Sequence, residues 1–289
     1  MEDTLVRIRF AILVLFSVCA VFAWLPQQGF SLDTENESYL QVHFLDVGQG
    51  DAIFIETPSG KQVLIDGGRD GSVLGELSKV MGFFDRDIDM VVGTHPDLDH
   101  IGGLIDVLKR YKVATILTTE NKGESSAANL YNTLKQSEGA EVVNARRGQT
   151  FAIGDGASLE VLFPDSDPTD MESNTSSIVL KLRYGSSTFL FTGDSPKNIE
   201  EYLVLTEGEN LQSDVLKVGH HGSRTSTSEL FLDEVAPTYA IISAGKDNSY
   251  GHPHVEVTDL LFNKRVTMLE TAKEGTITLL SDGTRVWPQ

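Results

Sequence analysis

The stretch GTHPDLDHIGG, residues 93–103, places two histidines and two aspartates at the end of an apolar run. His95 and Asp97 are two positions apart, so in an extended loop their side chains point to the same side. Asp99 and His100 are adjacent, and they need a tight turn into the following helix to face a second point. Because imidazole and carboxylate are ligands of Zn, Mn and Fe, the stretch predicts two incomplete half-sites for metal. The alternative is a polar turn between a strand and a helix.

Other polar groups fall at the same kind of place, just past the C-terminal end of an apolar run. They are Asp46, Asp51, Asp66–Gly68, Gly193–Asp194, His220–Ser223 and Tyr250–His254. In α/β proteins such strand ends commonly face one crevice. Six of the seven histidines lie in three of these loops, and the seventh, His43, falls in the middle of a predicted strand and is interpreted as structural. Unrelated turn residues would explain one such loop but not three, so we expect the loops to converge.

The order of elements after residue 38 predicts the fold class. Strands are expected over 40–45, 52–56, 62–65, 88–94, 114–118, 141–144, 158–163, 177–182, 188–192, 214–218, 239–243, 266–269 and 276–280, and helices over 72–81, 101–111, 127–136, 228–235 and 255–262. Two mixed sheets covered by helices on their outer faces fit this alternation. The predicted class is therefore α/β (α+β), with one domain over residues 39–289.

Bulk properties limit the function classes. The chain has 289 residues and a net charge of −19, which argues against binding nucleic acid over the whole surface, because backbone phosphates favour clusters of Lys and Arg. A locally positive cleft or a bound divalent metal could still receive an anion. The only cysteine is Cys19, which excludes intrachain disulfides and a thiolate zinc site. Any metal must be held by oxygen and imidazole.

The N-terminal part differs from the rest. Arg7 and Arg9 precede an apolar run, residues 10–25, that contains one serine. As a helix it would span about 24 Å at about 1.5 Å per residue, short of the roughly 30 Å hydrocarbon core. We predict that residues 1–31 are a signal peptide or a single membrane anchor with a short linker, with a buried core helix as the alternative. Both main interpretations place residues 39–289 outside the cytoplasm, either secreted or membrane-anchored.

Five motifs in order resemble a known family. HPDLDH (95–100) resembles the HxHxDH signature of the metallo-β-lactamase fold, with Asp97 in place of the middle histidine. The stretches FLDVGQGDA (44–52), LIDGG (64–68), LKVGHHGS (216–223) and NSYGHP (248–253) are similar to the hydrolase domain of ComEC-type DNA-uptake competence proteins. The resemblance covers roughly residues 39–285. We expect a stand-alone hydrolase unit without the transmembrane channel domains of the full competence proteins.

The resemblance implies a four-layer αββα sandwich with two divalent metal ions, Zn or Mn, at one edge of the sheets. Carried over residue by residue, His95 and Asp97 would bind the first metal, Asp99 and His100 the second, Asp194 would bridge both, His252 would be the last histidine ligand, and His221 or His220 would be a further ligand or the proton donor to the leaving group. Asn174 stands where many relatives carry another histidine. With Asp97, this leaves the first site short of imidazole, which shifts its preference towards Mn or Mg relative to Zn.

The leading hypothesis is metal-dependent hydrolysis of DNA phosphodiesters outside the cytoplasm, related to competence and DNA uptake, with single-stranded DNA as the expected partner. Asp99, His220 and His221 would be catalytic, and Ser223, Arg224, Asn174 and Lys217 would contact the substrate.

Two alternatives stay open. One is hydrolysis of a small ester, thioester or lactam, because the fold supports many substrates and the acidic surface favours a small one. The other is a metal-stabilised binding module without catalysis. That module predicts the loss of the bridging aspartate or of a half-site, whereas Asp99, His100, Asp194 and His252 are all present.

Overall fold

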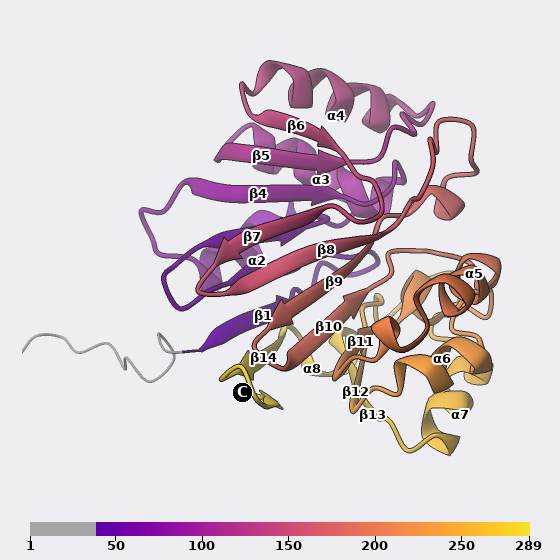
Figure 1. The fold of residues 1–289 in the computed structure, drawn as a ribbon. Helices are drawn as coiled ribbons and strands as arrows, with labels where there is room; N and C mark the ends of the chain where they lie inside the picture. Colours follow the sequence, from indigo (N-terminus) through magenta and orange to yellow (C-terminus); the bar gives the residue numbers. More distant parts are fainter. Residues whose placement is uncertain (1–38) are drawn as a thin grey trace, which may run out of the picture. The chain divides into compact units, whose positions relative to one another are not determined.

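The structure is a computed structural model that describes residues 39–289. Two mixed sheets face each other, and helices cover their outer faces (Figure 1). This is the predicted αββα sandwich. The signal peptide or anchor predicted for residues 1–31 lies outside the described residues. Within the described range, none of the helices combines the length and the apolar composition that crossing a bilayer requires.

The first sheet has the strand order β15-β14-β1-β2-β3-β4-β5-β6. Its strands are β1 (Leu40–Phe44), β2 (Ile53–Glu56), β3 (Gln62–Ile65), β4 (Asp87–Gly93), β5 (Lys112–Thr118), β6 (Glu141–Asn144), β14 (Ile277–Ser281) and β15 (Val286–Pro288). The helices on its outer face are α2 (Ser72–Val80), α3 (Leu98–Leu108) and α4 (Ser126–Ser137).

The second sheet has the order β13-β12-β11-β10-β9-β8-β7. Its strands are β7 (Thr150–Gly154), β8 (Ala157–Phe163), β9 (Val179–Tyr184), β10 (Ser187–Phe191), β11 (Val215–Lys217), β12 (Tyr239–Ile242) and β13 (Thr267–Glu270). Helices α5 (Lys197–Glu207), α6 (Glu229–Val235) and α7 (Val255–Asn263) pack on its outer face, and the short α8 (Thr271–Glu274) follows β13. Short 3₁₀ turns are η1 (Asn174–Ser176), η2 (Gly208–Leu211) and η3 (Gly219–Gly222).

Alternating side chains build the layers. Along β2, Ile53 and Ile55 face the second sheet, whereas Phe54 faces the helices. This period of two is what a strand with both faces buried requires. The central layer is therefore a continuous apolar core between the sheets, and each outer layer is a second core under the helices.

Parallel strands bring the predicted site loops to one edge. Strands β3, β4, β5 and β6 run parallel in the first sheet, and β10, β11, β12 and β13 run parallel in the second. Loops that follow parallel strands leave from the same end of a sheet. The two sheets therefore present their carboxyl-end loops side by side.

Helix α3 begins three residues earlier than the predicted 101. Its first turn contains Asp99 and His100, so the turn into the helix is itself the metal motif. A Cβ added to Gly103 would lie 1.9 Å from the carbonyl oxygen of Gly67. Only glycine permits this approach, and it presses α3 directly onto the turn after β3.

The sequence interpretation missed β7, α5, α8 and β15. Glu200 on α5 is fully buried and accepts hydrogen bonds from the backbone N–H groups of Thr227 (2.6 Å) and Ser228 (2.8 Å). The spacing of apolar residues along a helix cannot predict the burial of such a carboxylate, because the backbone N–H groups that it satisfies belong to another loop.

Candidate metal centre

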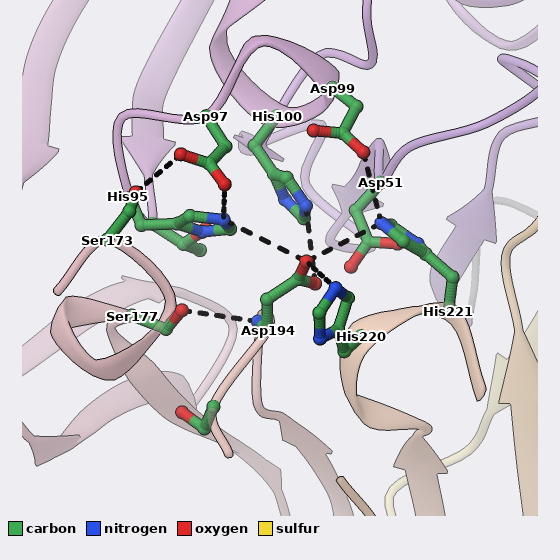
Figure 2. A network of polar contacts seen from close by, with 12 residues as sticks. Asp51, His95, Asp97, Asp99, His100, Ser173, Ser177, Asp194, His220 and His221 are labelled. Carbon is green, nitrogen blue, oxygen red and sulfur yellow. Dashed lines mark hydrogen bonds and ion pairs between the residues drawn. The ribbon is translucent and has the colours of Figure 1, made fainter. Parts of the chain in front are cut away.

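Asp194, which follows β10, lies at the centre of a cluster of imidazoles (Figure 2). Its Oδ1 is 3.3 Å from Nε2 of His100. Its Oδ2 is 3.9 Å from Nε2 of His95, 3.6 Å from that of His220 and 3.7 Å from that of His221. Four imidazoles from two separate loops, one after each of β4 and β11, thus converge on one buried carboxylate.

The atoms that face one another in this cluster have no hydrogen-bond partner. Nε2 of His95, His100 and His221 and Oδ1 of Asp194 are all buried and unpaired. Buried polar atoms are otherwise nearly always hydrogen-bonded. Four groups of side chains each have their ligand atoms within 4.8 Å of one another: His95/His100/Asp194, Asp99/His100/His221, Asp51/Asp66/His100 and Asp51/Asp194/His221. Unpaired imidazole nitrogens and carboxylate oxygens that lie this close together are suitable ligands for divalent cations.

His95 is held with its free nitrogen towards Asp194. The hydroxyl of Thr94 donates to Oδ2 of Asp66 at 2.7 Å, so its oxygen accepts from Nδ1 of His95 at 3.0 Å. This leaves the lone pair of His95 on Nε2, which is the state that a metal ligand needs. Burial, together with the neighbouring His100, lowers the pKa of His95 and keeps it neutral.

His100 lies between two carboxylates. Its Nδ1 donates to Oδ2 of Asp66 at 2.8 Å, and its Nε2 faces Asp194. Burial works to lower the pKa of His100, but the carboxylates of Asp194 and Asp66 outweigh it and raise that pKa well above its usual value. The same negative charge attracts a divalent cation in place of the proton.

His221 is oriented from behind by a backbone carbonyl. Its Nδ1 donates to the C=O of Ser243 at 2.9 Å, and its Nε2 is 3.5 Å from Oδ2 of Asp99. Burial works to lower the pKa of His221, but Asp194 and Asp51 outweigh it and raise the pKa to about 9. Burial works against ionisation of Asp99, yet contact with His221 lowers its pKa to about 2. Asp99 is therefore an anion beside His221.

The His220–Gly222 turn is strained in a way that aims both imidazoles. His220 (φ 48°), His221 (φ 55°) and Gly222 (φ 81°) are three consecutive left-handed residues. Each non-glycine residue in this region costs on the order of 1 kcal/mol or more, and such strain gathers at functional sites. A Cβ on Gly222 would lie 2.6 Å from Cβ of Pro253, so this turn packs closely against the loop that carries His252.

The sequence interpretation of Lys217 is wrong. Its side chain is fully buried, and its Nζ lies 2.7 and 2.8 Å from the two carboxylate oxygens of Asp51, so it offers nothing to a substrate. Burial works to raise the pKa of Asp51, but Lys217 and His221 outweigh it and lower that pKa.

Asp51 and Asp66 are the residues to which the sequence analysis gave no role. Both contact imidazoles of the cluster, Asp51 through His221 at 3.2 Å and Asp66 through His100. Their position just after apolar runs was the sequence feature that could have assigned them to the site.

Asp97 and His252 lie at the margin of the cluster. Asp97 Oδ2 is 3.9 Å from Nε2 of His95, its side chain is 43 % exposed, and the hydroxyl of Ser173 donates to its Oδ1. The ring of His252 lies 5.6 Å from that of His220. Burial, with His221 and His220, lowers the pKa of His252 to about 4. Their roles as ligands stay predictions.

The predicted substrate contacts lie further out. Arg224 is exposed and pairs with Glu256 at 3.3 Å. Ser223 is buried, with its hydroxyl 2.9 Å from that of Thr225. Asn174 lies in η1, and its side-chain oxygen is buried without a partner. The structure brings none of the three into the cluster, and their roles stay predictions.

The chain is similar in sequence to several known proteins. ComE operon protein 3 of Bacillus subtilis is 35 % identical over 82 % of this chain and 32 % of its own length. Recombination protein 2 of Haemophilus influenzae is 30 % identical over 94 % and 31 %, and competence protein ComA of Neisseria gonorrhoeae is 33 % identical over 84 % and 32 %. The chain thus spans about a third of the length of these relatives.

Solved structures share the fold. CmlA, a diiron β-hydroxylase from Streptomyces venezuelae, has a TM-score of 0.53 at 17 % identity, covering 80 % of this chain and 52 % of its own. Zn(2+)-bound PqqB from Methylobacterium extorquens has a TM-score of 0.52 at 10 % identity, covering 80 % and 87 %. The family model of the metallo-beta-lactamase superfamily matches residues 45–246. The chain therefore belongs to the metallo-β-lactamase superfamily and is related to competence proteins.

Proposed function

We propose that residues 39–289 form a metal-dependent phosphodiesterase that cleaves DNA, taken as a single strand, outside the cytoplasm. The observation that carries the proposal is the set of unpaired nitrogens of His95, His100 and His221 around Asp194. The similarity to competence proteins supports DNA as the substrate. Residues 10–25 would export or anchor this domain.

Two divalent cations, Zn or Mn, would supply Lewis acidity for water activation and for the charge that develops on phosphoryl oxygens. Within the protein, Asp194 holds both sides of the centre together. Each imidazole is fixed in the ligand orientation by a hydrogen bond from its Nδ1. The acceptor is Thr94 for His95, Asp66 for His100 and the Ser243 carbonyl for His221.

His220 fits the proton donor better than His221. The His220 side chain is 25 % exposed, and its Nδ1 lies 3.1 Å from the hydroxyl of Thr225. His221 is buried and fixed between Ser243 and Asp99. A proton donor must reach the leaving oxygen of a bound substrate, and of the two only His220 is open to it.

The test is an assay of the full chain on single- and double-stranded DNA with Mn and Zn supplied separately. We expect cleavage that needs metal and is lost in Asp194→Ala. The His220→Asn variant should keep its metal and lose turnover by about 100-fold or more. Absence of DNA cleavage by the metal-loaded chain would sink the proposal.

The second candidate is hydrolysis of a small ester, thioester or lactam. The observation that favours it is the net charge of −19, which repels a polyanion. Esters, thioesters and lactams are therefore assayed beside DNA with the same variants. Turnover of one of them, with DNA left intact, would establish the second candidate in place of the first.

A further inference from the structure

A large cleft begins beside the metal centre. It has a volume of about 1040 Å³, and Asp97 and Ser173 form one part of its wall. The remainder of the wall comes from the loop 119–125, the C-terminal half of α4, the edge strand β6 and residues 169–171. In the sheet register Thr118 of β5 pairs with Gly93 of β4. Thr119, which lines the cleft, directly follows β5, and the loop that carries His95 directly follows β4, so the two lie on neighbouring strands about 5 Å apart.

The cleft contains a buried lysine without a carboxylate partner. Lys135 on α4 is only 9 % exposed. Its Nζ donates to Oγ1 of Thr118 at 3.2 Å and lies 5.3 Å from the ring centroid of Tyr131. None of the ion pairs formed within residues 39–289 includes Lys135. A buried ammonium group without a counter-ion is costly, so its position indicates an anion that arrives from outside.

A second lysine lies close enough to repel the first. Burial and the charge of Lys122 together lower the pKa of Lys135 to about 8. Lys122 lines the same cleft, is exposed, and also forms no ion pair within the described part of the chain. Acidic residues outnumber basic ones by 42 to 23 in this chain. Among residues 39–289, other exposed lysines also form no ion pair, but here an unpaired lysine and a buried one line the same cleft.

The acidic residues of the cleft do not neutralise this pair. Glu120 is held by the guanidinium of Arg146 and by Nδ2 of Asn144. Asp97 faces His95 and Ser173 at the metal end. Glu124 and Asp170 lie exposed at the rim. The part of the cleft that contains Lys122 and Lys135 is therefore positive, whereas its outer edge is acidic.

We propose that Lys122 and Lys135 form an anion subsite that binds a phosphate of the substrate strand next to the scissile one. This rests on the proposed function. None of the residues that line the cleft is Phe, Tyr or Trp, so it offers no surface for base stacking. Recognition through phosphate alone makes binding independent of base sequence and dependent on salt.

The test measures binding and turnover separately. Binding of a labelled thymidine dodecamer is titrated at several salt concentrations with the parent chain and with Lys122→Gln/Lys135→Met. We expect about tenfold weaker binding and a slope of log K against log salt that is smaller by about 0.7, the value for one single-strand phosphate contact. Lys122→Gln alone, at an exposed position, should show part of the loss. Thermal melts confirm that both variants fold.

The matched control is Lys109→Gln/Lys112→Gln, which changes the net charge by the same amount. Lys112 begins β5, and Thr118 ends it, so the control lysines lie at the opposite end of that strand. Equal loss of binding in the control and subsite variants would overturn the proposal, as would unchanged binding in the subsite variant or no binding by the parent.

A small diester separates this proposal from the proposed function. Bis(p-nitrophenyl) phosphate carries only one phosphate, so when that phosphate is at the metal centre none is left for the subsite. We expect its turnover to be unchanged in the subsite variant, whereas KM for the dodecamer rises about tenfold. If no phosphodiester is cleaved, the proposed function fails and the binding titration still decides the subsite. Equal effects on both substrates would overturn it. Dodecamers with and without a 5′-phosphate show whether the subsite takes a terminal or an internal phosphate.

Discussion

The two sides of Asp194 differ in how firmly they can hold a cation. On the first side, Nε2 of His95 is 3.9 Å from a carboxylate, that of Asp97, whose side chain is 43 % exposed. On the second side, Nε2 of His221 is 3.5 Å from Asp99, and these side chains are 1 % and 23 % exposed. A ligand that is buried and fixed keeps its orientation without further ordering on binding. We call the side of Asp99 and His221 the firm side, because both of its carboxylate and imidazole groups are largely buried. We call the side of His95 and Asp97 the adjustable side, because the Asp97 carboxylate is partly exposed.

The first side is also the one that opens into the cleft. Asp97 and Ser173 belong to the cleft wall, whereas Asp99 and His221 do not. We therefore expect substrate contacts and metal contacts to meet on the side of His95 and Asp97. We therefore predict that metal identity and substrate handling both depend on Asp97.

The largest effect should come from removing the carboxylate that both sides share. Asp194→Ala should lower the affinity for Mn and Zn on both sides by more than about 100-fold, because loss of a ligand exceeds the 10- to 100-fold effect of a residue that only supports one. Equilibrium dialysis with metal analysis measures the bound equivalents. Asp87→Ala, at the other end of β4, is the control. Retention of one full equivalent would show that Asp194 does not bridge.

Convergence on one edge was predictable from the sequence, because loops after parallel strands leave from the same end. His95, His100, Asp194 and His221 meet there as the motifs indicated. The sequence also predicted the strands of both sheets other than β7 and β15, with ends shifted by one or two residues at most positions.

Contacts between the two sheets were not predictable. Asp51 and Lys217 are 166 positions apart and meet only because the turn after β1 faces the end of β11. No local pattern encodes how one sheet is placed on the other. Lys217 was therefore interpreted from its nearness in sequence to His220 and His221, although its side chain faces the opposite sheet. The left-handed φ of His220 and His221 could not be predicted from the sequence either, since histidine does not require it.

A smaller effect should follow from emptying the firm side alone. His221→Ala should cost about one metal equivalent and lower the affinity of that side by about 100-fold, while the side of His95 keeps its cation. The matched variant is His220→Ala, one position earlier in the same turn. It should retain both equivalents, because His220 is partly exposed and is the proposed proton donor rather than a metal ligand. If the two variants lose metal equally, His220 and His221 share one role and the comparison fails.

Replacing Asp97 by histidine should change the metal preference of the adjustable side. Asp97→His should raise the affinity for Zn relative to Mn by about tenfold, since imidazole suits Zn and carboxylate suits Mn. Competition between the two metals, measured on the His221→Ala background, isolates this side. Asp87→His adds a histidine at the far end of β4 as the control. An unchanged Zn to Mn ratio would mean that Asp97 contacts no metal.

The smallest effect should come from the hydroxyl that holds Asp97 in place. Ser173→Ala removes the hydrogen bond to Oδ1 of Asp97. Because that carboxylate is partly exposed, water replaces much of the bond, and a net loss of about 0.7 kcal/mol corresponds to about threefold weaker Mn binding on this side. Ser166→Ala, whose hydroxyl contacts only Asp165, is the control. A loss as large as that in Asp194→Ala would show that the side of Asp97 is as rigid as the other, and that the adjustable side does not exist.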